Sequence, residues 1–336
     1  MNKIESNETE FFYNVARLIN DARSHIVKTV NSTMVITYYE IGRRIVEKEQ
    51  KGADRAEYGQ KLIKGMSTYL TEHLGRGFSI TNLKQMKKFY LIYSSNQKGQ
   101  LLTDLFEPAI SWTHYVQLMR ITNIDERSFY EQEISSNNWT IKEFQRQFDS
   151  ALYERLVLSK DKEKVSALSQ IGQIIESPVD IIKDPYILEF LNLPEHSNYS
   201  ESELEQEIID HLQEFMLELG KGFSFVARQE RFTFAEDSFF VDLVFYNRLL
   251  RCFVLVDLKI GKITPQDAGQ MQLYVNYYDR EVIVDSEHPT IGIILCKNKN
   301  DSVVKMMLPE DNKQIFASKY ETVLPTKEQL LKLLND

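Results

Sequence analysis

Hydrophobic residues recur at helical spacing over the first half of the chain. Apolar positions three and four residues apart run from about Phe11 to Leu158, interrupted by a polar break over 54–58 and a loop over 96–103. Within this region, helices are predicted over 80–94, 126–135 and 140–158. The first half is therefore predicted to be an all-helical domain, residues 1–160.

The pattern changes after a transition over 161–200 that contains a charged run and several prolines. An amphipathic helix is predicted from Ser202 to Leu219, and the spacing from Ser202 to Glu205 allows a capping box. The elements predicted after it are three strands, a helix, a strand and a final helix, over 224–234, 239–246, 252–259, 265–279, 290–296 and 326–334. This order predicts an α/β domain with a mixed sheet over 201–336.

The second and third of these strands are expected to pair as an antiparallel hairpin, and each carries an acid within an apolar run. If Leu249 and Leu250 lie at the tip of the turn, Asp242 faces Asp257 directly. Because side chains alternate between the faces of a strand, Lys259 shares a face with Asp257. Two facing carboxylates repel each other unless a cation lies between them, so the pattern predicts a metal site.

Composition limits the class of protein. The chain has 336 residues, 26% of them charged and 11% aromatic, with a formal net charge of −9, which suits a folded two-domain protein. The two cysteines, both in apolar runs, cannot build a disulfide framework or a CxxC zinc site, which favours a reducing cytoplasm. The first residues do not resemble a signal peptide, and no apolar run reaches the roughly 18 residues of a membrane span. We therefore expect a cytoplasmic protein.

The local charge differs from the overall charge. Residues 51–100 contain nine Lys or Arg and three Asp or Glu, a local charge of +6. Helix, glycine-containing turn and basic helix form the outline of a helix-turn-helix, whose second helix contacts DNA. The candidate DNA contacts are Arg76 in the turn and Lys84, Lys87 and Lys88 on the basic helix. A helical scaffold with solvated lysines has the same outline, and the pattern alone does not decide between them.

The two facing acids suggest a specific chemistry. Carboxylates on adjacent strands are hard oxygen ligands suited to Mg²⁺ or Mn²⁺, which activate water and offset charge that develops on a phosphodiester. Lys259 could orient that water or stabilise the developing charge. Gln270 and Tyr274 lie four residues apart, on one face of the predicted helix, and could contact the scissile strand. A buried acid beside a lysine can also be only a salt bridge.

These residues resemble a known nuclease motif. Asp242, then Val256-Asp257-Leu258-Lys259 and Gln270-Met271-Gln272-Leu273-Tyr274, look like the PD-(D/E)xK nuclease core with a QxxxY helix. The wider sequence resembles the YhcG-type family of bacterial nucleases, in the segments 183–191, 218–223, 245–246, 268–271, 75–79 and 111–112. The resemblance runs from about residue 10 to 330.

The resemblance implies a restriction-endonuclease-like αβββαβ core that cleaves DNA with Mg²⁺ or Mn²⁺, behind a helical DNA-binding domain. Family members are thought to act in DNA recombination, repair or defence against foreign DNA. Carried over by position, Asp242 and Asp257 are metal ligands, Lys259 is catalytic, and Gln270 and Tyr274 form the helix motif.

A glutamate of the first helix completes the family's metal site. Glu205 matches it best, with Glu207 and Glu214 as nearby alternatives. Val241 stands where the motif name has proline, and Asp257 takes the position that can be Glu. Neither change removes a ligand.

Two further alternatives concern function and assembly. A catalytically silent DNA-binding or adaptor protein could retain the nuclease fold, although such a protein is expected to have lost one member of the set Asp242, Asp257 and Lys259. A cut in both DNA strands would favour a homodimer.

Overall fold

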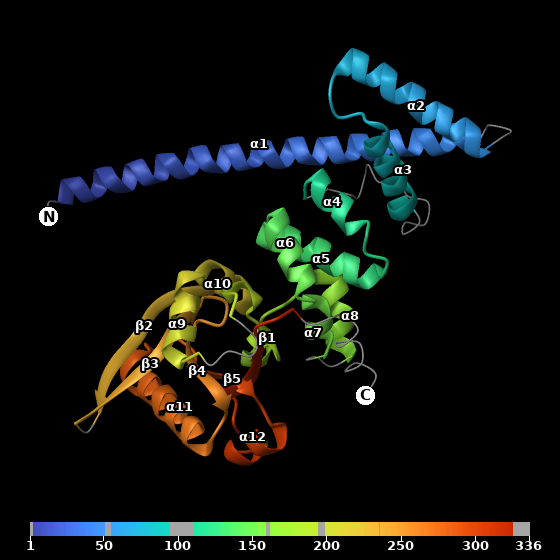
Figure 1. The fold of residues 1–336 in the computed structure, drawn as a ribbon. Helices are drawn as coiled ribbons and strands as arrows, with labels where there is room; N and C mark the ends of the chain where they lie inside the picture. The colour runs from blue at the N-terminus through green and yellow to red at the C-terminus, as the bar shows by residue number, and fades with distance from the viewer. Residues whose placement is uncertain are drawn as a thin grey trace. The chain divides into compact units, whose positions relative to one another are not determined.

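The computed structural model describes residues 3–50, 55–94, 110–158, 162–193, 199–234 and 236–324 (Figure 1). The chain divides into two compact units, Met1–Ile141 and Lys142–Asp336. The final helix predicted over 326–334 lies outside the described residues. No helix in the described ranges is long and apolar enough to cross a membrane.

The described part of the first unit is helical, as predicted. Its helices are α1 (Lys3–Gln50), α2 (Arg55–Leu74), α3 (Ile80–Ser94), α4 (Trp112–Leu118) and α5 (Ile124–Asn137). Ile45, Ile63, Leu83 and Met86 form a buried cluster that joins the first three helices. A Cβ atom at Gly42 would collide with the backbone of Met86, so glycine permits the close crossing of α1 and α3.

The predicted segment of helix, glycine turn and helix is present between α2 and α3. Gly75 and Gly77 have φ values of 85° and 118°, a region that favours glycine. Ser79 then caps α3, because its Oγ accepts a hydrogen bond from the Asn82 amide at 3.2 Å. The sequence therefore placed both ends of α3 correctly.

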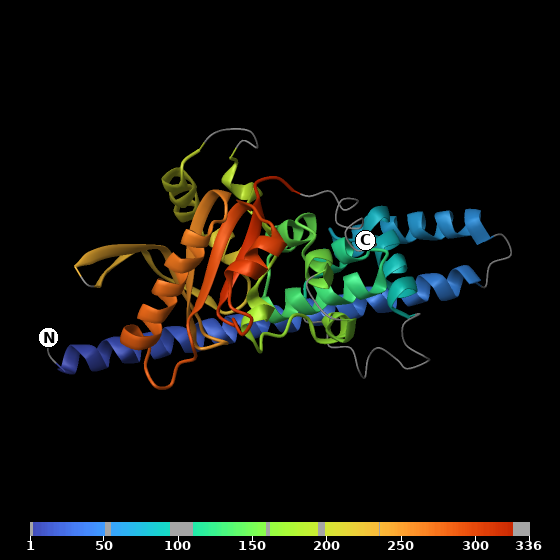
Figure 2. The same ribbon diagram turned by 90° about the horizontal axis from the view of Figure 1, so that it is seen from below.

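The second unit contains a six-stranded mixed sheet in the order β1-β6-β5-β4-β3-β2 (Figures 1 and 2). Strands β2, β3 and β4 pair antiparallel, whereas β4, β5, β6 and β1 pair parallel. The strands are Tyr186–Ile187, Phe223–Phe234, Asp237–Asn247, Cys252–Lys262, Ile291–Asn298 and Ile315–Glu321, numbered β1 to β6. The α-helices are α6 (Ile141–Asp149), α7 (Leu152–Leu158), α8 (Lys162–Ile171), α9 (Glu201–Asp210), α10 (Leu212–Leu219), α11 (Pro265–Tyr277) and α12 (Asp301–Met307). The predicted αβββαβ order is therefore confirmed.

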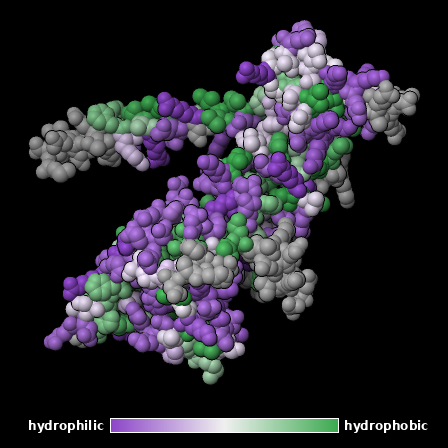
Figure 3. Space-filling model, in the orientation of Figure 1, coloured by the Kyte–Doolittle hydropathy of each residue, from purple (hydrophilic) through white to green (hydrophobic). Residues whose placement is uncertain are grey.

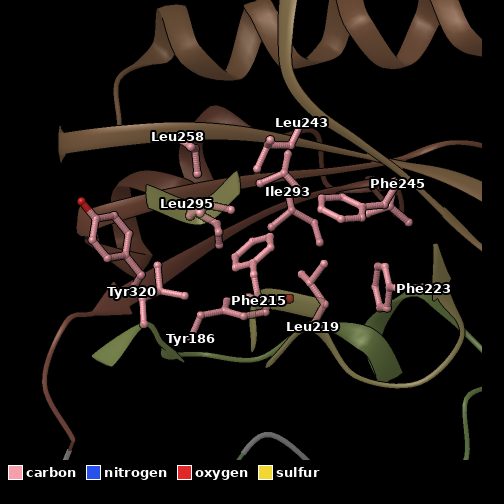
Figure 4. Close-up of a cluster of buried hydrophobic side chains, with 14 of the residues drawn as sticks. Tyr186, Phe215, Leu219, Phe223, Leu243, Phe245, Leu258, Ile293, Leu295 and Tyr320 are labelled. Carbon is pink, nitrogen blue, oxygen red and sulfur yellow. The ribbon is translucent and has the colours of Figure 1, made fainter. Parts of the chain in front are cut away.

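Helices pack on both faces of the sheet. On one face, Figure 4 shows Phe215 and Leu219 of α10 beside Leu243, Phe245 and Ile293 of the strands. The other face packs against α11, with a buried cluster formed by Val244, Leu255, Met271, Tyr274, Val275 and Ile294. Both faces of the central strands are thus buried, which explains their nearly continuous apolar sequence.

Two predicted helices are each divided in the structure. The helix predicted over 140–158 breaks at Ala151, whose φ of 51° is left-handed. The helix predicted over 202–219 breaks at His211 and begins earlier than expected. Neither Ala151 nor His211, which has a φ of −115° and a ψ of 35°, has the backbone geometry of an α-helix, so each residue ends the helix before it.

The capping box of α9 is also displaced. Ser200 and Glu203 form it, and the Glu203 amide donates to Ser200 Oγ at 3.2 Å, so the predicted pair of Ser202 and Glu205 is wrong. The sequence contains the Ser-x-x-Glu spacing twice, two residues apart, and the earlier copy caps the helix. Glu205 therefore lies inside α9 with a side chain that is not used in capping.

Several elements were not predicted, including α8, which lies in the segment 161–200 that was expected to be a transition. Strand β6 pairs parallel to β5, the two-residue β1 pairs with β6, and α12 lies between β5 and β6. Most of α6 and all of α7 also fall in the second compact unit, whereas the sequence pattern predicts them within the domain 1–160. Both helices contribute arginines to a buried ion cluster of this unit.

Candidate active site

The two predicted acids lie where the β3–β4 ladder ends. The ladder pairs Asn247 with Cys252 and continues to Leu243 with Val256, so the register places Asp242 opposite Asp257, as predicted. Beyond this point, β3 continues beside β2, and β4 continues beside β5. The two strands therefore separate here, and we call this point of separation the fork. At the fork, Asp242 Oδ2 accepts a hydrogen bond from the Leu258 amide at 2.8 Å.

Asp257 is the more deeply buried acid, with 2% of its surface exposed. Burial, and then the nearby Asp242 carboxylate, raise the pKa of Asp257 to about 7, although Lys259 opposes this shift. Burial also raises the pKa of Asp242, although the Leu258 amide and Lys259 oppose it. The pair therefore carries more negative charge than its surroundings stabilise.

Lys259 supplies the positive charge at the fork. Its Nζ lies 2.9 Å from Asp257 Oδ2, which confirms that the two side chains share a face. Glu201 and Asp267 lie 3.7 and 4.0 Å from the same nitrogen. Burial disfavours the ammonium form, but Asp257 and the other acids outweigh burial and raise the pKa of Lys259. Lys259 is therefore a hydrogen-bond donor at neutral pH.

Glu205 is the first-helix glutamate that joins this group. It is 4% exposed, and the side chains of Arg228 and Gln229 donate hydrogen bonds to its two carboxylate oxygens. Gln229 Nε2 also donates to Asp242 Oδ1 at 3.0 Å, so it links the two acids. Glu207 instead lies 3.7 Å from His211. The geometry therefore favours Glu205 over Glu207 as a member of the site.

Gln270 and Tyr274 form a connected pair on α11. The Gln270 amide donates to the Tyr274 hydroxyl, which donates to the Phe240 carbonyl at 2.7 Å. Tyr274 is 1% exposed, and burial raises its pKa. Its hydroxyl thus holds α11 against β3, near Asp242, and Gln270 is the more accessible member of the pair.

The chemistry of the donor set fits a hard divalent cation. In the described part of the chain, no three His, Cys, Asp or Glu side chains already converge as a metal-binding group. Asp242 and Asp257 nevertheless place two carboxylates against one ammonium, and burial, followed by repulsion from Asp242, raises the pKa of Asp257. A cation such as Mg²⁺ or Mn²⁺ would relieve this repulsion and accept carboxylate oxygens as ligands.

The candidate DNA-binding residues of the first unit differ in their surroundings. Lys87 pairs with Glu49, and Lys88 donates to the Met119 carbonyl at 2.8 Å. Arg76 and Lys84 are exposed. Two of the four predicted contacts are therefore engaged within the helical unit itself.

Sequence reasoning missed three residues around the acids, namely Gln229, Arg228 and Glu201. The feature that places Gln229 at the site is the pairing register of β2 with β3. Arg228 pairs with Leu243 and Glu230 with Val241, which places Gln229 across from Asp242. The pairing of β2 with β3 shifts between Phe225 and Ala227, so this register could not be counted from a regular hairpin.

The αβββαβ core with its facing acids and nearby lysine defines a nuclease fold of the PD-(D/E)xK class. Two family matches agree: the "YhcG PDDEXK nuclease domain" matches residues 179–335, and the "DUF1016 N-terminal domain" matches residues 14–155. The chain is 38% identical over 341 residues to the Escherichia coli (strain K12) protein named "Putative nuclease YhcG", covering 94% of this chain and 90% of that protein. The chain therefore belongs to the YhcG family of PDDEXK nucleases.

Two solved structures resemble the chain more distantly. One is a repair endonuclease from Pyrococcus abyssi, with 18% identity, a TM-score of 0.26, and coverage of 38% of this chain and 50% of that one. The other is an EndoMS–dsDNA2 complex, with 13% identity, a TM-score of 0.26, and coverage of 40% and 51%. The chain thus spans about half the length of these two proteins, and the family assignment rests on the sequence matches.

Proposed function

We propose that the protein is a Mg²⁺- or Mn²⁺-dependent DNA endonuclease that hydrolyses phosphodiester bonds. The observation that carries this proposal is the undercompensated pair of Asp242 and Asp257 beside Lys259, at the fork between β3 and β4. These residues occupy the acid, acid and lysine positions of the PD-(D/E)xK motif. A complete set favours an active nuclease over a silent DNA-binding or adaptor module.

The side chains of the fork have distinct parts in this reaction. Asp242, Asp257 and Glu205 would hold the cation, which supplies a Lewis acid and lowers the pKa of a bound water. Lys259 remains an ammonium group and donates a hydrogen bond toward the attacked phosphate, where negative charge develops. Tyr274 fixes α11 on β3 and positions Gln270 at the edge of the site.

The helical unit is proposed to bind the DNA. Residues 51–100 carry the local positive charge, and Arg76 and Lys84 offer exposed cations to phosphate oxygens. A role in DNA recombination, repair or defence against foreign DNA follows only from the family resemblance. The site supports the proposed cleavage of a phosphodiester bond and carries no information on the pathway.

Cleavage of supercoiled plasmid by the full-length chain tests the proposal. We expect nicked or linear products with Mg²⁺ or Mn²⁺, none with EDTA, and none from Asp257→Asn or Lys259→Ala. The matched controls are Asp237→Asn on β3 and Lys262→Ala on β4, both exposed, which should cleave like the unmodified protein. Metal-independent cleavage, or full activity of either site variant, would contradict the mechanism.

A second outcome identifies the silent module. The unmodified protein would then bind DNA but leave plasmid, branched, single-stranded and linear substrates intact with both cations. That result would replace the nuclease proposal with a binding function.

A further inference from the structure

The N-terminal half of α1 has an apolar face that the other described helices of the first unit leave exposed. Phe11, Phe12, Val15, Leu18, Ile19 and Ile26 are between 39% and 69% exposed. The opposite face is mostly polar, although it also carries Tyr13 and Val27, and Arg17 and Asp21 form an exposed ion pair on it at 3.8 Å. Figure 3 shows hydrophobic patches along this helix. Large apolar side chains on one face of a polar helix indicate a surface that binds a partner.

The spacing of these residues specifies the kind of partner. Phe12, Ile19 and Ile26 recur every seven residues, and Val15 and Ala22 follow the first two by three positions. This is the a and d pattern of a coiled coil, in which a helix packs against a similar helix. In the second half of α1, by contrast, Val35, Tyr39 and Ile45 are buried within the first unit. The uncovered heptads therefore precede the part of α1 that its own unit uses.

We infer that this face binds the same face of a second copy of the chain and forms a two-fold dimer. The six exposed side chains present on the order of 700 Å² per chain, or about 1,400 Å² for two copies, within the range of stable interfaces. A face that pairs with itself closes a two-fold assembly without further contacts. The inference is independent of the nuclease activity.

The mass of the full-length protein in solution, from light scattering after gel filtration, tests the dimer. We expect the mass of two chains for the unmodified protein and of one chain for the double variant Phe12→Glu with Ile19→Glu. The matched control, Asn14→Glu with Lys28→Glu on the polar face, should remain dimeric. Any unmodified mass other than two chains, or a double variant that stays dimeric, overturns the inference.

Cross-linking provides a second test that does not depend on disrupting the helix. Ile19 lies at the centre of the apolar face, so two copies place it close to its equivalent in either orientation. Ile19→Cys should form a disulfide between chains on mild oxidation, whereas Asn14→Cys should not. The natural cysteines Cys252 and Cys296 are buried and do not interfere. Equal cross-linking of both variants, or none, contradicts the proposed face.

A different observation concerns Gln229 and rests on the proposed function. Gln229 has a φ of 47°, uncommon for a residue with a side chain, and its amide nitrogen donates to both Glu205 and Asp242. These carboxylates come from α9 and β3 and would otherwise repel each other. We propose that Gln229 is a positioning residue that holds Glu205 beside Asp242 for a divalent cation.

Removal of the amide tests this role directly. Gln229→Leu keeps the size of the side chain but cannot donate a hydrogen bond, so the affinity for Mn²⁺ should fall at least about tenfold. Titration calorimetry with Mn²⁺ alone measures the affinity without DNA or turnover. Gln213→Leu, an exposed change on α10, is the matched control and should bind Mn²⁺ normally.

The proposed cation-dependent function and the proposed role of Gln229 fail in different ways. If neither the unmodified protein nor any variant binds Mn²⁺, the proposed cation-dependent function and the role of Gln229 both fall. If the unmodified protein binds Mn²⁺, Asp257→Asn does not, and Gln229→Leu binds with unchanged affinity, only the role of Gln229 is overturned. Unfolding of Gln229→Leu in EDTA, measured beside the control, shows whether lost affinity reflects lost structure.

Discussion

Two buried ion clusters in the second unit differ in their charge balance. Glu218 is fully buried, and its oxygens lie 2.6 Å from Arg155 Nη1 and 3.5 Å from Arg146 Nη1. The Ile187 amide also donates to it at 2.9 Å. Burial raises the pKa of Glu218, but Arg155, Lys183 and Arg146 together outweigh burial and lower it to about 2. This carboxylate is ionised at every ordinary pH.

Asp257 has the opposite balance, although it is almost as deeply buried. It shares one ammonium group with Asp242, and its pKa rises to about 7. The comparison separates two uses of a buried acid. A structural acid such as Glu218 is surrounded by enough cations within the fold, whereas Asp257 retains a charge that an external cation could balance.

The largest expected effect lies at the undercompensated cluster. Lys259→Met should lower the rate of DNA cleavage at least about a hundredfold, because it removes the donor to the developing charge. The free energy of unfolding should fall by less than it does in Glu218→Gln, because Asp257, whose pKa is already raised to about 7, can take up a proton when the ammonium group is absent. Plasmid nicking rates and denaturant unfolding curves of the same preparation measure both quantities. A large loss of stability with retained cleavage would reverse the comparison.

The compensated cluster should show the reverse behaviour. Glu218→Gln leaves the buried Arg155 without its carboxylate, and Arg146 with Glu189 as its partner, and should reduce the free energy of unfolding by about 3–5 kcal/mol. Denaturant unfolding followed by circular dichroism measures the loss. Asp285→Asn, a change of an exposed acid, should stay close to the unmodified protein. Equal stability of the two variants would show that the arginine cluster is not structural.

The clusters should also respond to pH in separate windows. Because the pKa of Asp257 rises from 3.8 to about 7 on folding, its contribution to stability is complete below pH 3.8 and is lost as pH rises through about 7. In EDTA, the protein should lose on the order of 2–3 kcal/mol between pH 5 and pH 8 from this group. Asp257→Asn should show a smaller loss over that range.

Glu218 provides the internal contrast for that measurement. Its pKa is lowered from 4.5 to about 2, so its contribution is present above pH 4.5 and lost as pH falls toward 2. Unfolding curves at pH 5, 6, 7 and 8 therefore report on Asp257 and not on Glu218. A flat profile for the metal-free protein would contradict the raised pKa of Asp257.

A bound divalent cation should balance the charge of Asp242 and Asp257, as the arginines already balance the charge of Glu218. Addition of Mg²⁺ or Mn²⁺ at pH 7.5 should raise the melting temperature by several degrees, in proportion to the logarithm of cation concentration above its dissociation constant. Asp257→Ala should show no such shift, whereas Glu218→Gln should keep it from a lower starting point. Thermal melts with and without EDTA make this comparison.

The smallest expected effect concerns Arg76 and the lysines of α3. Here too, a charged group that has a partner within the fold is expected to act on stability, and one without a partner is expected to bind a ligand. All three of Arg76, Lys84 and Lys88 are exposed, but the Nζ of Lys88 donates a hydrogen bond to the Met119 carbonyl of its own unit. Arg76→Ala with Lys84→Ala should weaken DNA binding and reduce its salt dependence by one to two units of slope, roughly one for each phosphate that is no longer neutralised. Lys88→Ala should mainly affect stability. Binding isotherms at several salt concentrations, measured with Ca²⁺ in place of Mg²⁺, distinguish these outcomes.

Much of the nuclease core could be predicted from sequence because its signals are local. The turn at Leu249 and Leu250 fixed the hairpin register, and the register brought Asp242 opposite Asp257. Thr264-Pro265 set the start of α11, where Thr264 Oγ accepts from the Asp267 amide. Each of these features depends on residues close together along the chain.

The remaining features depend on distant contacts. Strand β6 is recognised only by its pairing with β5, and the link from Gln229 to Glu205 joins β2 to α9. The capping of α9 was ambiguous because two Ser-x-x-Glu spacings overlap. Compensation of a buried acid by arginines 63 and 72 positions away has no sequence signature at all.

The position of those arginines has a practical consequence for dissecting the protein. The nuclease family match begins at residue 179, but Arg146 and Arg155 lie upstream in α6 and α7. A recombinant fragment cut at the family boundary would retain Glu218 without either guanidinium group. A fragment for separate expression of the nuclease should therefore begin no later than residue 142, where the second compact unit starts.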